Sequence, residues 1–105
     1  MVTSPNHPNN YPNNFRRTNT IEVEEGLIVE MHFTAFDVEF DSTCDYDHVT
    51  IKSGDGTTLM EKTCGSSLPA TLTSPSNIVE IHFHTNDWGP RSGWRLTWRA
   101  VTPGA

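Results

Sequence analysis

Hydrophobic and polar residues alternate with a period of two along much of the chain. In three segments apolar residues occupy every second position and mostly polar residues lie between them. These apolar sets are Leu27, Val29, Met31 and Phe33; Val79, Ile81 and Phe83; and Trp94, Leu96 and Trp98. Because successive side chains of a strand point to opposite faces, the pattern predicts three strands, each with one face in the core.

Two shorter apolar pairs predict two further strands. They are Ile21 with Val23, and Val49 with Ile51. Turn-forming residues bound the predicted strands at 25–26, 54–56, 73–75 and 89–90. Several short strands with one apolar face each are typical of a β-sandwich or barrel, and 105 residues suffice for one domain.

The two ends of the chain differ from this pattern. The first twenty residues are rich in Pro and Asn, and Tyr11 is the only large residue before Phe15. Such a composition is compatible with a disordered linker. We expect instead an ordered, extended edge segment in which Tyr11 closes one end of the sandwich. Residues 102–105 are predicted to begin a linker or tail, within a single domain that spans 1–105.

Charge and motifs exclude several classes of function. The formal net charge is -6, with only seven Lys and Arg residues, which disfavours nucleic acid and favours basic partners. No apolar run is long enough to insert across a bilayer. The chain lacks a Gly-x-Ser-x-Gly elbow, an HExxH helix and a glycine-rich phosphate loop. We therefore predict that it is not an enzyme, although it can be a non-catalytic module of a larger protease.

Cys44 and Cys64 are the two cysteines of the chain. They enclose a loop of about twenty residues, for which a disulfide would contribute roughly 3 kcal/mol of stability. Two buried free thiols in a cytosolic protein are the alternative. The small, strand-rich character of the chain favours the disulfide.

Several sequence blocks, in order, resemble those of a CUB domain. The blocks are SPNHPNNYP, IEVEEGLIVEMHFTAFDVE, CDYDHVTIKSGDG, KTCG, IHFHTND and a later SGW. The similarity runs from Ser4 to about Arg99. It implies an extracellular or secreted module with a jelly-roll-like, all-β sandwich of two antiparallel sheets.

The resemblance has two departures. Where many family members have a cysteine of a first disulfide and a nearby Trp, this chain has Arg17 and Asn19. In this register the family's first strand is also missing before VTSP. The chain therefore resembles either the one-disulfide CUB modules of complement-type proteases or a CUB domain trimmed at its N-terminus. In this register Cys44–Cys64 corresponds to the disulfide that both subsets share.

The resemblance to the calcium-binding subset also implies a metal site. It assigns calcium ligands to the side chains of Glu39, Asp47 and Asp87 and to the main chain of Gly89, where relatives often have Ser or Asn. Tyr11 matches a tyrosine that supports these ligands. The chemistry agrees, because calcium prefers oxygen ligands and neutralises carboxylates that would otherwise repel one another.

Other polar residues near these positions receive different interpretations. Asp37, Asp41 and Asp45 match no ligand position and are interpreted as solvated loop charges. A zinc site of His32, His82 and His84 is conceivable, but outward-facing neighbours on strands explain them better. Trp88 lies either beneath the ion site or exposed as a contact residue.

These observations predict a calcium-dependent recognition module. It would bind a Lys or Arg side chain of a protein partner through Glu39 and Asp47, with His48 and Trp88 in the same partner-binding site. A glycan-binding module that uses Trp88 is one alternative, and a structural or dimerisation module of a mosaic protease is another. The sequence specifies neither the identity of the partner nor the oligomeric state.

Overall fold

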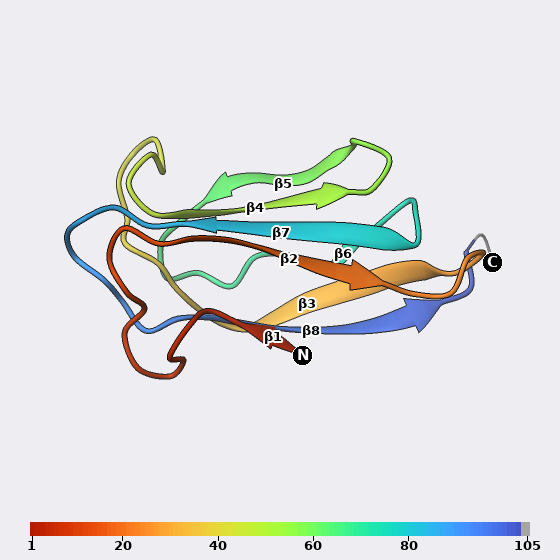
Figure 1. Cartoon of the computed structure of the whole chain (residues 1–105), viewed down its shortest axis with the longest axis horizontal. Coiled ribbons are helices and arrows are strands. Elements are labelled where there is room, and N and C mark those ends of the chain that lie inside the picture. The colour runs from red at the N-terminus through yellow and green to blue at the C-terminus, as the bar shows by residue number, and fades with distance from the viewer. Residues whose placement is uncertain (104–105) are drawn as a thin grey trace.

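The structure is a computed structural model that describes residues 1–103 as two facing β-sheets (Figure 1). The described residues form eight strands and no helix. The strands are β1 (Val2–Thr3), β2 (Arg16–Glu22), β3 (Ile28–Asp37), β4 (His48–Ser53), β5 (Thr58–Thr63), β6 (Leu72–Thr73), β7 (Ile78–His84) and β8 (Gly93–Val101). No helix in this part of the chain is long and apolar enough to cross a membrane.

The two sheets contain four antiparallel strands each. One sheet has the order β1-β8-β3-β6 and the other the order β2-β7-β4-β5. Of the described strands, only β4 and β5 are neighbours both in sequence and in a sheet. Chain segments far apart in sequence therefore meet at both ends of the sandwich, and the predicted all-β, two-sheet architecture is confirmed.

The alternating segments form the long strands, as predicted. Val29, Met31 and Phe33 are buried in β3, and Val79, Ile81 and Phe83 are buried in β7. In β8 the prediction is confirmed for Trp94 and Leu96 but is wrong for Trp98, which is 37% exposed. Trp98 pairs with the buried Met31, yet the residues that follow it in β8 are also largely exposed. The core continues at this level in β3, where Val29 pairs with Ala100 and is fully buried, so only the last part of β8 lies outside it.

Strand β5 and the two-residue strands had no clear signal in the sequence. The side chains of β5 are exposed or half-buried throughout, because β5 is the edge strand of its sheet. Without a buried face, the sequence shows no alternation. Of the predicted tail, residues 102 and 103 follow β8, whereas 104 and 105 lie outside the described residues.

Aromatic rings form a continuous series through the core. Tyr11 lies 5.1 Å from Phe83, and Phe83 lies 5.7 Å from Trp94 (distances between ring centroids). Phe33 extends the series to Phe36, and all these contacts are edge-to-face. Tyr11 is only 1% exposed, so its predicted place at one end of the sandwich core is confirmed.

A disulfide joins Cys44 to Cys64 across 20 residues, in agreement with the prediction. We expect the double variant Cys44→Ser, Cys64→Ser to lose about 3 kcal/mol of unfolding free energy, because its unfolded chain is no longer restricted by this loop. Urea denaturation of the variant and of the wild type measures the difference. Chemical reduction of the wild type should produce a similar loss, and an unchanged free energy of unfolding in the variant would contradict the expectation.

Candidate functional site

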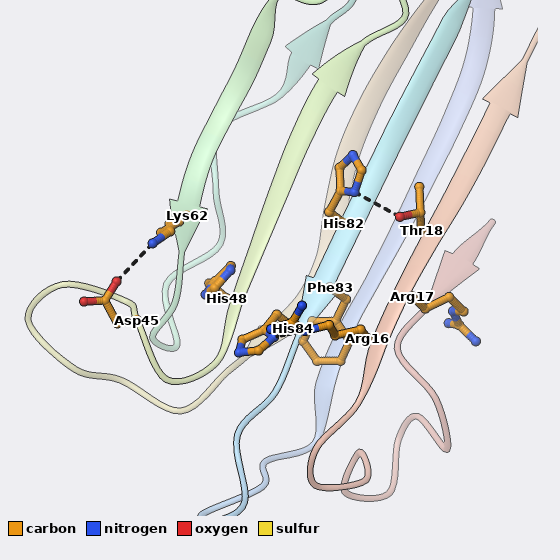
Figure 2. A pocket seen from close by; sticks show the side chains of 9 residues that line it. All are labelled: Arg16, Arg17, Thr18, Asp45, His48, Lys62, His82, Phe83 and His84. Carbon is orange, nitrogen blue, oxygen red and sulfur yellow. Dashed lines mark hydrogen bonds and ion pairs between the residues drawn. The ribbon is translucent and has the colours of Figure 1, made fainter.

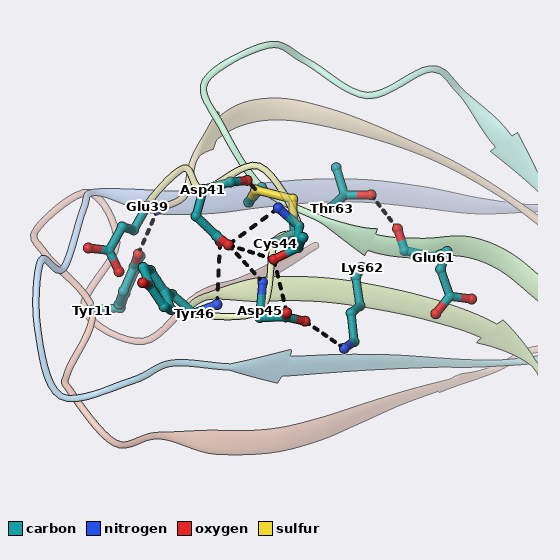
Figure 3. Close-up of a disulfide and its surroundings, with 11 residues drawn as sticks. Tyr11, Glu39, Asp41, Cys44, Asp45, Tyr46, Glu61, Lys62 and Thr63 are labelled. Atoms are coloured by element: carbon teal, nitrogen blue, oxygen red, sulfur yellow. Dashed lines mark hydrogen bonds and ion pairs between the residues drawn. A yellow bond between two sulfur atoms is a disulfide. The ribbon is translucent and has the colours of Figure 1, made fainter.

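The segment 38–47 connects β3 to β4 and is fixed at two points, one of which is the disulfide (Figure 3). Val38 and Gly65 exchange two backbone hydrogen bonds of 2.9 Å. Gly65 follows Cys64, whose disulfide partner Cys44 lies in the middle of the segment. The same short stretch of chain therefore holds the connection at two points, which restricts where the side chain of Glu39 can lie.

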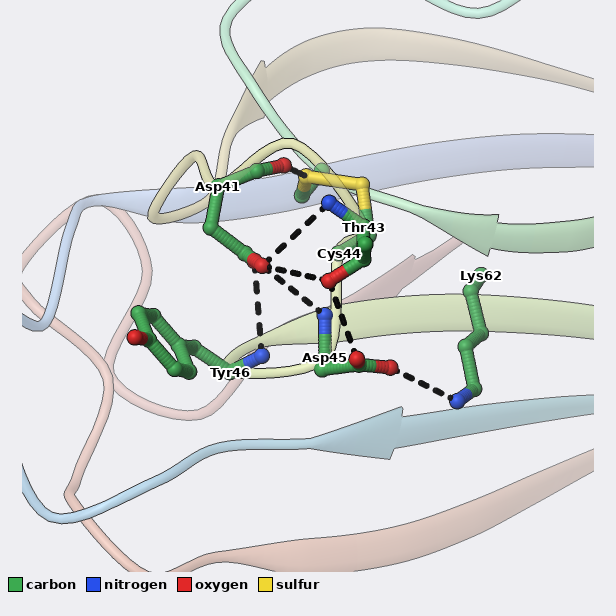
Figure 4. A network of polar contacts seen from close by, with 7 residues as sticks. Asp41, Thr43, Cys44, Asp45, Tyr46 and Lys62 are labelled. Carbon is green, nitrogen blue, oxygen red and sulfur yellow. Dashed lines mark hydrogen bonds and ion pairs between the residues drawn. A yellow bond between two sulfur atoms is a disulfide. The ribbon is translucent and has the colours of Figure 1, made fainter.

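Asp41 organises the middle of this connection (Figure 4). Its carboxylate accepts hydrogen bonds from the backbone N–H groups of Thr43 (3.3 Å), Asp45 (3.4 Å) and Tyr46 (3.4 Å), and from the Thr43 hydroxyl (2.9 Å). Partial desolvation raises the pKa of Asp41, but the hydrogen bonds from Thr43, Tyr46 and Asp45 outweigh it and lower the pKa. Asp41 is a partly exposed loop charge, as predicted, but its side chain also closes the loop upon itself.

Asp37 and Asp45, which were interpreted with Asp41 as solvated loop charges, also have partners. Asp45 forms an ion pair of 3.0 Å with Lys62, and Asp37 forms one of 3.2 Å with Arg91. An Asp side chain often accepts a hydrogen bond from the backbone N–H two residues later. This local tendency could have identified Asp41 as a loop-closing residue. Asp45 also accepts a hydrogen bond of 2.9 Å from the nearby Thr43 hydroxyl, but the ion-pair partners of Asp37 and Asp45 are distant in sequence, so no local signal predicts them.

Tyr11 and Asp47 form a buried polar pair at the end of the core. The Tyr11 hydroxyl donates to Asp47 Oδ2 and accepts a hydrogen bond of 3.1 Å from the backbone N–H of Glu39. The other oxygen of Asp47, Oδ1, accepts a hydrogen bond of 2.8 Å from the backbone N–H of Asn86. Burial, the hydrogen bond to Asp47 and the negative charge of Asp47 all raise the pKa of Tyr11. The phenol therefore stays protonated and continues to donate to the carboxylate.

Glu39 is a second buried acid beside this pair. Glu39 is only 9% exposed, and no described residue donates a hydrogen bond to its buried Oε1 atom. Desolvation, followed by the negative charges of Asp47 and Asp41, raises the pKa of Glu39. A buried carboxylate that lies near another and lacks a full set of donors is unfavourable unless a cation compensates it. The donor set is therefore suited to a cation.

Gly89 lies directly against the Glu39 carboxylate. A Cβ atom added to Gly89 would overlap with Glu39 Oε2, far inside van der Waals contact. The backbone of Gly89 also has a φ of 72°, in the left-handed region that glycine adopts most easily. Glycine at this position thus lets the main chain approach the carboxylate.

Asp87 and Trp88 precede Gly89 but point into solvent. Asp87 is exposed and its side chain has no hydrogen bond or ion pair with any of residues 1–103. Trp88 is 73% exposed, so of its two interpretations the structure supports exposure. The structure thus brings Tyr11, Glu39, Asp47 and Gly89 together and leaves Asp87 at the surface, where water hydrates its charge. Within the described part of the chain, no three His, Cys, Asp or Glu side chains are close enough to share a metal ion.

His48 belongs to a different surface from Asp47. Asp47 directly precedes β4, which begins at His48, and the two side chains point to opposite sides of the chain. Asp47 is fully buried, whereas the His48 ring stacks on His84 of β7 with 5.0 Å between ring centroids. His84 and His82 are therefore neighbours on an outer sheet face, as predicted, and His32 lies in the other sheet.

With this geometry in view, comparison with known proteins gives the family. The CUB domain family model matches residues 1–98. The chain belongs to the CUB domain family. CUB domains of this type are protein-interaction modules without catalytic activity, so this domain is not an enzyme.

Relatives of this CUB domain include two much longer human proteins. Human mannan-binding lectin serine protease 1 is 38% identical over 104 residues, which are 96% of this chain and 15% of the relative. Human cubilin is 31% identical over 106 residues, which are 99% of this chain and 3% of the relative. The chain thus spans only a small part of the length of these relatives.

Solved CUB domains have the same fold. The CUB1-EGF-CUB2 domain of human MASP-1/3 superimposes with a TM-score of 0.88 at 39% identity, covering 95% of this chain and 38% of the other. The MASP-1 CUB2 domain bound to Ca2+ has a TM-score of 0.85 at 35% identity, covering 93% of this chain and 88% of the other. Calcium is therefore a ligand within the family.

We expect the Gly89→Ala variant to disturb the site. The new methyl group would collide with Glu39 and the backbone would be strained, so the unfolding free energy should fall by about 1–2 kcal/mol. Chemical denaturation measures this loss. Gly56→Ala is the matched control, because Gly56 also has a positive φ (95°) but open space around a new Cβ. Equal losses in the two variants would show that contact with Glu39 is unimportant.

A second expectation concerns pH. Desolvation and the charge of Arg16 lower the pKa of His84 below its usual 6.5. The unfolded chain therefore binds more protons than the folded one below about pH 6.5, and the unfolding free energy should decrease as the pH falls. The His84→Gln variant should show a shallower decrease between pH 7 and pH 5. Urea denaturation in EDTA tests this, and parallel curves for both proteins would contradict it.

Proposed function

We propose that this CUB domain is an extracellular, calcium-dependent recognition module that binds a Lys or Arg side chain of a protein partner. The observation that supports this proposal best is the buried pair of carboxylates, Glu39 and Asp47, that Tyr11 braces. Two acids that are held together away from water need a positive charge nearby. A metal ion and a basic side chain can supply that charge together.

Calcium fits the chemistry of these residues. The proposed donors are the carboxylates of Glu39, Asp47 and Asp87 and the main-chain oxygen of Gly89, all of them oxygen atoms of the kind that calcium prefers. The exposed side chain of Asp87 would have to turn toward the other two acids when the ion binds. Glu39 Oε1 is buried without a hydrogen-bond partner among the described residues, so it is available to an ion. The calcium-bound MASP-1 CUB2 domain, at 35% identity, supports the same ligand for this chain.

The surface around the carboxylates suits a basic partner. Calcium uses only part of the capacity of the two carboxylates, so they can still accept charge-assisted hydrogen bonds from an ammonium or guanidinium group. Phe40, Tyr46 and Trp88, which are 72%, 53% and 73% exposed, lie on the same two loops as Glu39 and Asp87. Exposed aromatic side chains commonly provide contact area in interfaces. The formal net charge of -6 also favours encounter with a basic protein.

An extracellular location agrees with two observations. The Cys44–Cys64 disulfide is of the kind that persists in oxidising compartments. Among the solved structures that resemble this chain is the full extracellular region of zebrafish Gpr126/Adgrg6, at 31% identity and a TM-score of 0.87.

Calcium binding is tested by calorimetric titration and by denaturation with and without the ion. At a free calcium concentration one hundred times the Kd, the wild type should gain about 2.7 kcal/mol of unfolding free energy. Asp47→Asn and Asp87→Ala should gain much less. Asp55→Asn is the control, since Asp55 lies in the β4–β5 turn at the other end of the sandwich (Figure 1). A wild type that calcium does not stabilise would refute the proposed metal site.

Recognition of the basic side chain needs a separate experiment. Lysine amide, titrated into the calcium-loaded protein and followed by NMR, should shift the amide signals of Glu39 and Asp47. Lysine amide acetylated on Nζ is the matched probe without charge, and it should not bind. Excess EDTA and high salt should both weaken binding. Binding that is equally strong in EDTA would exclude this mechanism even if calcium itself binds.

A further inference from the structure

The outer face of the β2-β7-β4-β5 sheet contains a second site, unrelated to the carboxylates. A pocket of about 450 Å³ opens there between these strands and the segment 38–47 (Figure 2). Strand register builds its floor, because Arg16 of β2 pairs with His84 of β7, which pairs with His48 of β4. These three side chains therefore form one row across the sheet.

Arg16 is held in place without being neutralised. Its Nε–H donates a hydrogen bond of 3.0 Å to His84 Nδ1. Since arginine is always a donor, His84 Nδ1 must be the acceptor, and His84 is neutral with its proton on Nε2. No carboxylate among residues 1–103 forms an ion pair with Arg16. The positive charge of the guanidinium remains available to a ligand.

Lys62 supplies a second cation from the edge strand β5. It pairs with Asp45 at 3.0 Å, but both side chains are substantially exposed, at 46% and 60%, so the pair is weak and open to competition. Asp45 is the only acid among the described residues that line the pocket. Arg17 adds little, because it donates to the Thr3 carbonyl oxygen (2.8 Å) on the other face of the sheet.

From this arrangement we propose that the pocket binds a sulfate or phosphate ester group of an extended ligand. The Arg16 guanidinium, the Lys62 ammonium and the imidazole N–H of His84 are hydrogen-bond donors that suit a tetrahedral oxyanion. This local positive potential stands out in a chain whose net charge is -6.

Two features bear on the kind of ligand. A transition metal ion does not fit, because Arg16 occupies His84 Nδ1 and adds a positive charge beside it. A second hollow of about 270 Å³ adjoins the pocket along the sheet, and its lining holds the two cations Lys52 and Lys62 and one acid, Glu61, beside Thr50 and His82. A single inorganic anion would fill only one of the two hollows. A ligand with several anionic groups along a chain would contact both.

The test is an NMR titration at constant pH 7.4 and constant ionic strength, in which sodium sulfate replaces sodium chloride. Sulfate should shift the signals of Arg16, His48 and His84 in a saturable manner. Arg16→Gln and Lys62→Gln should each weaken binding about tenfold, as expected for the loss of a charge-assisted contact. Arg95→Gln is the matched control, because Arg95 is an exposed arginine of β8 in the other sheet, and it should bind sulfate as the wild type does.

Further titrations identify the source of the anion and separate this site from the calcium site. Sodium phosphate and a heparin hexasaccharide are the second and third probes, and tighter binding of the hexasaccharide than of either inorganic anion would indicate a sulfated glycan. Tighter binding of phosphate would indicate a phosphate ester. All binding should persist in EDTA, whatever the outcome for calcium. The absence of saturable shifts with all three probes, or equal binding by Arg16→Gln and the wild type, would overturn the proposal.

Discussion

The hydrogen bond from the Tyr11 hydroxyl to the buried Asp47 carboxylate connects the fold to the site. Through it and its neighbours, three distant segments meet: the N-terminal segment with Tyr11, the connection 38–47, and the loop after β7 that begins with Asn86. Tyr11 also packs edge-to-face on Phe83, so the polar cluster rests on the hydrophobic core. Loss of Tyr11 would remove one hydrogen-bond partner from the Asp47 carboxylate and one from the backbone of Glu39.

The position of the acids involves a conflict between stability and binding. Burial and then repulsion by the negative charge of Asp47 raise the pKa of Glu39. The folded protein is therefore less stable than it would be with a neutral cluster at this place. The disulfide and the Val38–Gly65 bridge hold the connection in spite of this repulsion. A domain that keeps such a cluster is suited to bind cations, because a cation removes the repulsion.

Strand geometry separates two opposite chemistries over a very short distance. Asp47 and His48 are consecutive, yet one points to the acidic end of the core and the other to the cation-lined pocket on the outer sheet face. One small domain can therefore present an acidic surface and a basic surface to different ligands. The overall charge of the chain reveals only the first of these surfaces.

The sequence alone determined the strands with a buried face, the two-sheet class and the disulfide, because these follow from local periodicity and from two cysteines in a small β domain. The resemblance to CUB domains also pointed to Tyr11, Glu39, Asp47 and Gly89, which the structure brings together. Only the tertiary structure decided that Asp41 closes a loop, that Asp87 is exposed, and that Arg16, His84 and His48 form one row. Edge strands such as β5 and contacts across strands depend on pairings between distant segments, and local patterns carry no information about such pairings.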